Sequence, residues 1–122
     1  MTNLGPVIPV LRIFDVAKAR EFYVDFLGFT IDFEHRFADN SPLYTGVSRD
    51  GCELHLTEHH GDACPGSAIR ITTDDVEALA AELSAKDYRY AKPGAPLATP
   101  WGTRELAVTD PFGNQLTFAQ GM

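Results

Sequence analysis

Residues 8–33, IPVLRIFDVAKAREFYVDFLGFTIDF, decide the fold because they contain a strand, a helix and the start of another strand in that order. The β-branched and aliphatic residues of 7–13 predict a strand. Asp15 follows as a helix N-cap, and apolar residues then recur at spacings of three and four. Gly28 stands where a left-handed residue commonly ends a helix. We therefore predict a helix over residues 16–27 between two strands.

A further strand and a hairpin complete the first half of the chain. The segment 29–37, FTIDFEHRF, follows the predicted helix. The segments 43–49, LYTGVSR, and 52–58, CELHLTE, are separated by Asp50-Gly51, a strong signal for a two-residue hairpin turn. The first half therefore has the element order βαβββ.

The second half repeats this order. After a loop at 61–66, the sequence predicts a strand at 68–73, a helix from Asp74 or Asp75 to about Lys86, a short strand at 88–91 and two strands near the end. Placing Asp15-Val16 on Asp75-Val76 gives an offset of 60 residues and superimposes the apolar stripes of the two helices. We predict an α+β domain over residues 1–122, built from βαβββ modules at 4–60 and 67–122.

The composition restricts the possible partners. The 122 residues carry 10 Lys and Arg against 17 Asp and Glu, a net charge of −7, without a basic cluster. The negative charge and the lack of a basic cluster argue against a nucleic-acid partner. The negative charge then either favours a cationic partner or simply keeps the protein soluble. Cys52 and Cys64 do not form a CxxC motif, and no signal peptide or membrane span is indicated. We expect a cytoplasmic protein with free thiols and no membrane partner.

Three motifs give the chain a family resemblance. They are the segment GFTIDF at 28–33, the run PWGTRE at 100–105, and the turn DPFGN at 110–114. The sequence resembles the glyoxalase/bleomycin-resistance superfamily, also called the vicinal oxygen chelate fold, and within it the bleomycin-resistance proteins. The resemblance implies a curved mixed sheet, a role in antibiotic resistance, and a homodimer with grooves shared between chains. Pro9 matches the family proline at which the N-terminal strand exchanges between partners, although an ordinary edge proline is the alternative.

The resemblance also permits a test for a metal centre. Enzymes of the superfamily hold a divalent metal at four strand positions, which fall here on Ile8, His55, Ala68 and Thr117. Only His55 can ligate, whereas catalytic metal sites generally use about three protein ligands. We therefore expect no metal, no cofactor and no catalytic residue. The alternative is a lyase or dioxygenase of the same fold with an atypical metal site around His55.

A ligand site is implied by the same resemblance. Phe33 and Trp101 match positions that sandwich the flat bithiazole of bleomycin, and Asp32 and Phe37 match the lining of that groove. A cationic ligand also favours a carboxylate, for which Glu105 is the further candidate. From the residues alone, Phe33 could be core and the two carboxylates could be ordinary surface groups.

Two further residues are expected on the groove face. Alternation places His55 opposite the helix-facing Leu54 and Leu56, which makes the cavity partly polar. Alternation along the predicted strand places Arg70 on one face with Ala68 and Thr72, where its charge inside the cavity would oppose a cationic drug. The predicted function is sequestration of a bleomycin-type cationic antibiotic. A smaller anionic or aromatic metabolite, and a structural dimer with a vestigial cavity, remain alternatives.

Overall fold

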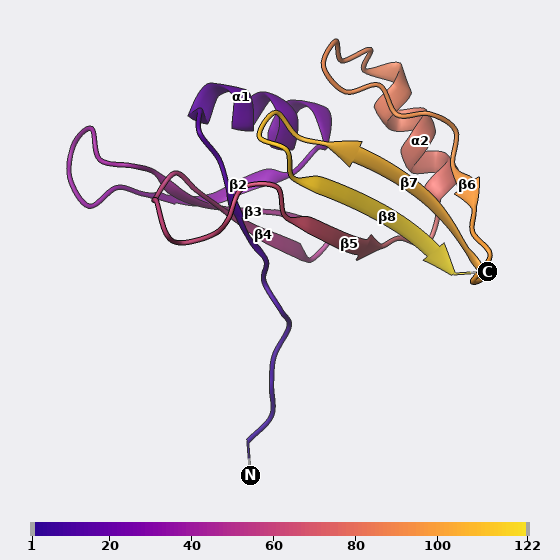
Figure 1. Ribbon diagram of the computed structural model, residues 1–122, viewed down its shortest axis with the longest axis horizontal. Helices are drawn as coiled ribbons and strands as arrows, with labels where there is room; N and C mark the ends of the chain where they lie inside the picture. The colour runs from indigo at the N-terminus through magenta and orange to yellow at the C-terminus, as the bar shows by residue number, and fades with distance from the viewer. Residues whose placement is uncertain (1, 122) are drawn as a thin grey trace.

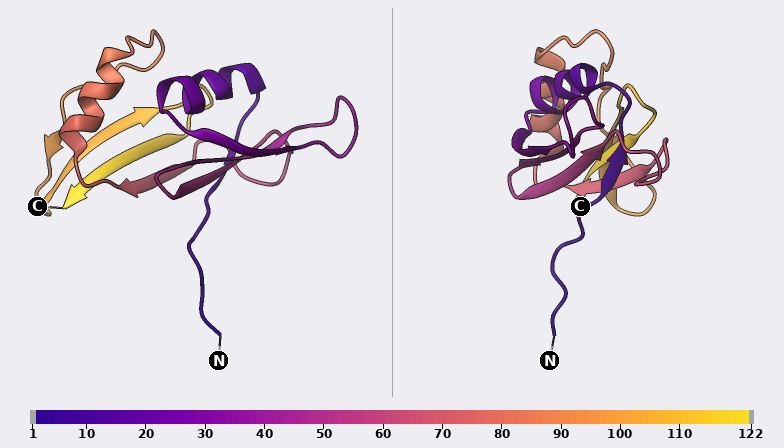
Figure 2. Two further views of the ribbon diagram at one scale, coloured as in Figure 1. Left: turned by 180° about the vertical axis from the view of Figure 1, so that it is seen from behind. Right: turned by 90° about the vertical axis from the view of Figure 1, so that its left-hand side faces the viewer.

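Two four-stranded mixed sheets, with both helices on the same side, make up the fold of the computed structural model (Figures 1 and 2). The structure describes residues 2–121. The helices cover one face of each sheet, and the other face, which we call the open face, carries no helix. The N-terminal segment leaves the body on the side of the open faces (Figure 1).

The first sheet is formed by β1 (Val10–Arg12), β2 (Thr30–His35), β3 (Tyr44–Arg49) and β4 (Cys52–Thr57). Its order is β1-β4-β3-β2, with β1 parallel to β4 and the other pairs antiparallel. The predicted hairpin turn is confirmed, because Asp50 and Gly51 have φ values of 53° and 81°. A type I′ turn requires positive φ at both of these positions.

The second sheet is formed by β5 (Ala68–Thr72), β6 (Leu97–Ala98), β7 (Thr103–Thr109) and β8 (Gln115–Gly121). Its order is β5-β8-β7-β6, and β5 runs parallel to β8, so the topology of the first sheet is repeated. The predicted α+β fold of two tandem βαβββ modules is confirmed. Each module forms its own four-stranded mixed sheet.

Both helices begin at the predicted aspartates. The Asp15 carboxylate accepts a hydrogen bond from the Lys18 amide, and Asp75 accepts one from the Ala78 amide, each at 2.9 Å. The first helix starts as α1 (Val16–Arg20) and continues as a π-helical segment, η1 (Glu21–Phe26), whereas α2 (Val76–Ala85) is α-helical throughout. No helix within residues 2–121 is long and apolar enough to cross a membrane.

The DPFGN turn joins the two modules. The buried Tyr23 hydroxyl donates to the Asp110 carboxylate at 2.6 Å, and that carboxylate also accepts from the backbone amides of Phe112 and Asn114. The Asn114 side-chain amide donates to Asp110 and to the Arg12 carbonyl in β1. Burial and the neighbouring Asp110 raise the pKa of Tyr23, so its hydroxyl stays a donor. The motif therefore has a structural role between the sheets.

An ion pair between Arg49 and Glu82 is a second connection between the two modules. Arg49 at the end of β3 donates to both carboxylate oxygens of Glu82 on α2, at 2.7 and 2.8 Å, and to the Leu27 carbonyl at 2.7 Å. These hydrogen bonds lower the pKa of Glu82 and raise that of Arg49. The modules are thus tied through side chains as well as through their shared apolar core.

One predicted strand is wrong. Residues 88–91 form no strand, and the short strand of the second module is β6 instead. Asp87 has a φ of 48°, which turns the backbone after α2, and Tyr88 packs against Phe26 with ring centroids 4.9 Å apart. The tyrosines of this segment therefore do not follow the alternation of a strand.

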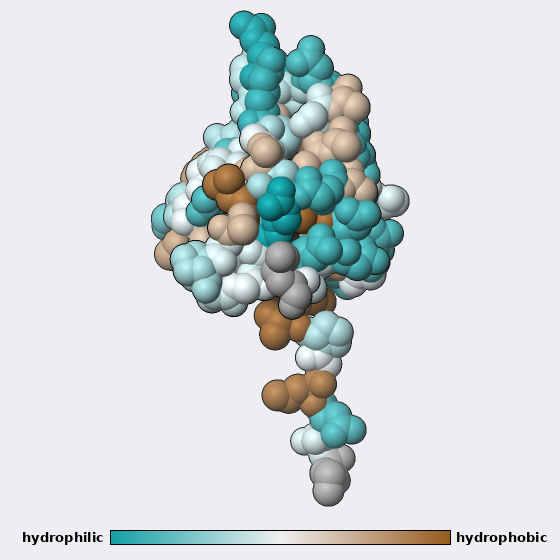
Figure 3. Space-filling model, turned by 90° about the vertical axis from the view of Figure 1, so that its right-hand side faces the viewer, coloured by the Kyte–Doolittle hydropathy of each residue, from teal (hydrophilic) through white to brown (hydrophobic). Residues whose placement is uncertain are grey.

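The first strand is shorter in the structure than the sequence predicts. Only Val10–Arg12 of residues 7–13 belong to β1, and residues 2–9 extend away from the body as an arm (Figure 1). Leu4 and Val7 in the arm are 99% and 91% exposed. Figure 3 shows hydrophobic side chains along the arm where it stands clear of the body. The arm thus presents apolar surface that its own chain does not cover.

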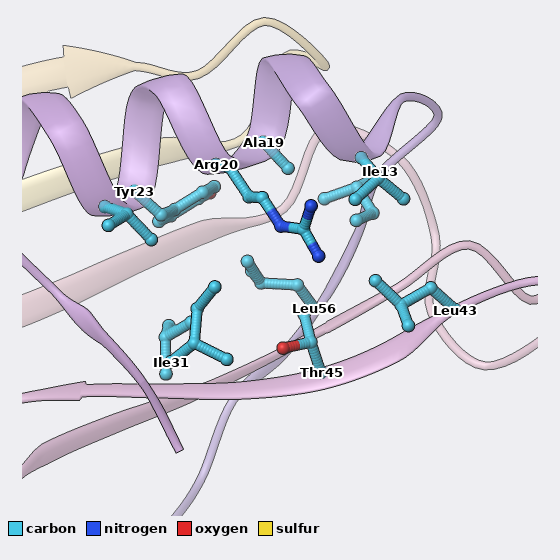
Figure 4. A pocket seen from close by; sticks show the side chains of 11 residues that line it. Ile13, Ala19, Arg20, Tyr23, Ile31, Leu43, Thr45 and Leu56 are labelled. Atoms are coloured by element: carbon cyan, nitrogen blue, oxygen red, sulfur yellow. The ribbon is translucent and has the colours of Figure 1, made fainter. Parts of the chain in front are cut away.

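A gap between α1 and the first sheet is too small for a ligand. Its volume is about 10 Å³, and the side chains of Ala19, Tyr23, Ile31 and Leu56 are among those around it (Figure 4). A cavity of this size holds at most one water molecule. This gap is therefore excluded as a ligand site.

Candidate functional site

Alternation along β4 places two polar side chains on the open face of the first sheet. Leu54 and Leu56 are buried on the helix side, as predicted. Glu53 and His55 therefore lie on the opposite face, and a 2.8 Å contact joins His55 Nε2 to Glu53 Oε2. The prediction that His55 faces away from the helices agrees with this arrangement.

A β-bulge at Asp32 brings Phe33 onto the same face. Ile31 pairs with Val47, whereas Phe33 pairs with Gly46, so the register shifts by one residue between them. Without this shift Phe33 would share the helix-facing side of Ile31, because strand side chains alternate. The exposed Asp32 is the extra residue of the bulge. This extra residue is the reason that Phe33 lies on the open face.

The Phe33 ring lies over Gly46 at the centre of the sheet. A Cβ atom on Gly46 would stand 2.2 Å from Phe33 Cε1, which is far inside van der Waals contact. The ring is stacked on Tyr44, at 6.3 Å and 13° between planes, and meets His55 edge-on at 5.3 Å. Phe33 remains 41% exposed. We call Phe33, Tyr44 and His55 the aromatic platform.

A cleft opens beside the platform. Its volume is about 410 Å³, and its lining residues come from the first module and the loop that follows it: Phe33, His35, Phe37, Tyr44, His59 and Asp62. Phe37 packs edge-on against His35 at 4.6 Å and against His59 at 5.7 Å. His59 also contacts Thr57, whose hydroxyl donates to Asp62 at 2.8 Å. The cleft thus combines aromatic walls with one carboxylate.

The second module carries an ionic cluster on its open face. Arg70 on β5 donates to both oxygens of Glu105 on β7, at 3.3 and 2.5 Å. Glu105 also accepts from the Trp101 indole at 3.2 Å and from the Thr103 hydroxyl at 2.6 Å. Arg70 and Thr103 lower the pKa of Glu105 to about 2. The positive charge that Arg70 was expected to bring to the cavity is therefore paired with a carboxylate.

The predicted site residues fall into two groups in one chain. Phe33, Phe37 and His55 come together in the first module, with Asp32 beside them in the bulge. Trp101, Arg70 and Glu105 form the second group. Trp101 precedes β7, which begins beside β6 at the opposite end of the molecule from the β2–β3 loop (Figure 1). Phe33 contacts Tyr44 and His55, whereas Trp101 contacts Glu105, so the two rings belong to separate groups within one chain.

Sequence reasoning missed Tyr44 and Gly46. Thr45 and Val47 are buried on the helix side of β3, so the period of two already places Tyr44 and Gly46 opposite them. An aromatic residue at Tyr44 and a residue without a side chain at Gly46, both on the open-face parity, were the available signals. The bulge that brings Phe33 over Gly46 has no comparable signal in the sequence.

The four superfamily metal positions carry a single ligating side chain, His55. Within residues 2–121, no three His, Cys, Asp or Glu side chains are grouped so that they could hold a metal ion. Burial raises the pKa of the Cys52 thiol, which makes that residue a poor nucleophile. The contacts on the open faces are stacking, hydrogen bonding and charge pairing.

Comparisons with known proteins agree with the topology. A family model described as a glyoxalase superfamily protein matches residues 2–122, and the chain belongs to this superfamily. A search of curated proteins found no match. Bleomycin-binding and bleomycin-resistance proteins are among the solved structures that share the fold.

Three solved structures illustrate the range of similarity. The bleomycin-binding protein of Streptomyces verticillus, crystallised with copper(II)-bleomycin, is 32% identical, with both chains covered in full and a TM-score of 0.76. A glyoxalase/bleomycin resistance protein from Streptomyces sp. CB03234 is 28% identical over 93% of this chain and 100% of its own, with a TM-score of 0.70. A superfamily member from Sphaerobacter thermophilus is 25% identical over 96% and 98%, with a TM-score of 0.72.

Proposed function

We propose that this protein is a homodimeric, metal-free binding protein that sequesters a bleomycin-type cationic antibiotic without modifying it. The ligand would lie in a groove formed by the aromatic platform of one chain and Trp101 of its partner. The observation that carries the proposal is the pair of exposed aromatic side chains, Phe33 and Trp101, on the open faces of different modules. The 32% identity to a bleomycin-binding protein supports the same ligand class.

The groove would suit a flat ring with a positive tail. Phe33 is 41% and Trp101 is 68% exposed, so both rings have free faces for stacking. Aromatic pairs of this kind gain about 0.5–1.5 kcal/mol beyond the area that they bury. Asp62 in the cleft and Glu53, which contacts His55 of the platform, add negative charge for a cationic group. A net charge of −7 favours the approach of a cation to the protein as a whole.

The N-terminal arm supports the dimer. Fully burying a Val or Leu side chain stabilises a protein by about 1.5–3 kcal/mol, and the arm leaves Leu4 and Val7 exposed. The arm begins at Pro9, whose carbonyl accepts from the His55 amide at 3.0 Å while its nitrogen has no proton to donate. β1 and β5 end their sheets and so offer free edges. We propose that the arm crosses to the partner at Pro9.

The proposal includes a cytoplasmic location and no resident metal. Both cysteines, Cys52 and Cys64, are free, which is usual in a reducing compartment. His55 alone occupies a superfamily ligand position with a suitable side chain. Elemental analysis of protein purified without chelator should therefore find less than about 0.1 equivalent of transition metal.

Calorimetric titration with copper(II)-bleomycin tests the function. We expect saturable binding of one antibiotic per chain, and quenching of Trp101, which is the only tryptophan. Trp101→Ala should weaken binding about 30-fold, which corresponds to about 2 kcal/mol for a central aromatic contact. Tyr90→Ala is the matched control, since Tyr90 is 63% exposed and lies outside both groups.

Two results would refute this function. The first is the absence of both heat and quenching with wild-type protein at ligand concentrations up to about 1 mM, a limit that corresponds to about 4 kcal/mol of binding free energy. The second is recovery of a chemically altered antibiotic after the complex is denatured, because sequestration leaves the ligand unchanged.

A further inference from the structure

The aromatic platform contains a chain of two hydrogen bonds centred on His55. The His55 Nδ1 atom lies 2.8 Å from the Tyr44 hydroxyl, and its Nε2 atom lies 2.8 Å from Glu53 Oε2. The three side chains come from neighbouring strands, because Tyr44 is on β3 and the other two are on β4. His55 therefore has a polar partner on each ring nitrogen.

With a neutral imidazole and an ionised Glu53 carboxylate, the chemistry of the three groups sets the direction of both bonds. An ionised carboxylate only accepts hydrogen bonds, so the proton of neutral His55 resides on Nε2 and is donated to Glu53. Nδ1 is then an acceptor, and the Tyr44 hydroxyl must donate to it. Burial and the nearby Asp62 raise the pKa of Tyr44, so this hydroxyl retains its proton. With its hydrogen directed at His55, the Tyr44 oxygen offers only lone pairs to a ligand.

The Tyr44 side chain belongs to the wall of the cleft. Tyr44 lines the cleft of about 410 Å³ next to the exposed Phe33 ring, and Asp62, another acceptor, lies in the same cleft. The two rings are nearly parallel, at 13°. A planar group stacked on Phe33 would therefore have its edge near acceptor groups.

We propose that His55, held by Glu53, is a positioning residue that makes Tyr44 a hydrogen-bond acceptor toward the ligand. The cleft is thereby selective for aromatic ligands with N–H donors on the ring edge, such as amides and ammonium groups, and disfavours carboxylate-bearing rings. This assignment rests on the proposed binding function and adds the polarity of the ligand to it. His55 acts through Tyr44 and does not itself touch the ligand.

Nitrogen NMR of histidine-labelled wild-type protein, without any ligand, tests the first half of the proposal. At pH 8, His55 should be the tautomer with Nε2 protonated and Nδ1 bare. In Glu53→Leu this preference should weaken, because the acceptor for the Nε2 proton is removed. A wild-type His55 with its proton on Nδ1 would overturn the assignment, since Tyr44 would then be the acceptor within the pair.

A double-mutant cycle with copper(II)-bleomycin tests the second half. Tyr44→Phe and His55→Leu should each weaken binding about tenfold, the value of one typical hydrogen bond. In the Tyr44→Phe background, His55→Leu should weaken binding less than twofold further, because His55 acts through the missing hydroxyl. His60→Leu, an exposed histidine outside the cleft, is the control. Melting temperatures of all variants establish that they are folded.

The outcomes separate this inference from the proposed function. Independent tenfold losses in the two backgrounds would refute the positioning role while leaving antibiotic binding intact. Failure of the wild type to bind copper(II)-bleomycin would refute the proposed function, whatever tautomer His55 adopts. Tighter binding by His55→Leu would also overturn the inference, because the acceptor polarity would then be unfavourable to the ligand.

Discussion

The first sheet carries rings on its open face, whereas the second sheet carries an ion pair there. At the centre of the first sheet, Gly46 pairs with His55, and the Phe33 ring covers the glycine. At the corresponding place in the second sheet, Ala107 pairs with Thr117, and the nearby Arg70 turns to Glu105. The helix-facing sides of both sheets are apolar and buried. Packing therefore maintains the shared topology, while the open faces are free to differ.

This difference gives the proposed dimer a functional reason. One open face supplies stacking surface and acceptors, and the other supplies a tryptophan held by the Glu105 carboxylate. A groove that needs both kinds of surface must combine a first module with a second module. Because Phe33 and Trp101 belong to separate groups within one chain, pairing two chains around a twofold axis would produce two equal grooves that each combine them.

The largest expected contrast is in the loss of stability when the hairpin turn of each module is altered. Asp110→Asn replaces an acceptor that Tyr23 and the Asn114 amide both use in the buried turn, so it should destabilise the protein by about 3 kcal/mol. Asp50→Asn, in the exposed turn of the first module, should cost less than about 0.5 kcal/mol because Asn accepts positive φ. Urea unfolding at constant m-value measures both.

Equal losses of stability in the two Asn variants would contradict this role for the DPFGN turn. They would mean that Asp110 does not hold the modules together more than an ordinary turn residue does.

The next contrast concerns the centres of the two sheets. Gly46→Ala would place a methyl group where the Phe33 ring lies, so the ring must leave the platform. We expect about tenfold weaker binding of copper(II)-bleomycin, about 1.4 kcal/mol, with little change in melting temperature because Phe33 is already half-exposed. Ala107→Gly is the matched control in the second sheet and should bind within twofold of wild type.

Near-ultraviolet circular dichroism reports the aromatic environment in these variants. An unchanged spectrum and unchanged affinity in Gly46→Ala would mean that the position of the Phe33 ring over Gly46 does not determine binding.

The smallest expected effect is the acid response of the second module. The pKa of Glu105 is lowered from 4.5 to about 2, so the stability contributed by its pairing is present above pH 4.5 and is lost as the pH falls through about 2. Trp101 emission should change in this lower range, because protonation weakens the acceptor of the indole N–H. Glu105→Gln should abolish the change.

Far-ultraviolet circular dichroism recorded in parallel distinguishes this titration from acid unfolding. A Trp101 transition centred near pH 4.5 in folded protein would contradict the pairing of Glu105 with Arg70.

The sequence predicted most of the fold because local signals decided it. Asp15 and Asp75 cap the helices, Asp50-Gly51 forms the hairpin turn, and the repeat reveals two modules. The strand expected at 88–91 failed because local residue preferences do not include the turn at Asp87 or the packing of Tyr88 on the core.

The candidate site was less predictable because it depends on contacts between distant residues. Regular alternation of side chains along β2 would place Phe33 on the core side. Only the bulge at Asp32 moves the Phe33 side chain to the open face. The pairing of Arg70 with Glu105 likewise joins strands that are 35 residues apart in the chain. The resemblance to bleomycin-resistance proteins identified Phe33 and Trp101 as candidates where residue patterns alone could not.

Mixing Phe33→Ala with Trp101→Ala tests the shared groove most directly. Each variant alone should lack high-affinity binding of copper(II)-bleomycin. After the chains are unfolded together and refolded, about half of the dimers should be mixed, and each mixed dimer should contain one groove with both aromatic residues. We predict wild-type affinity at about a quarter of the wild-type stoichiometry. Wild-type binding together with no restored sites in the mixture would contradict a groove built from two chains.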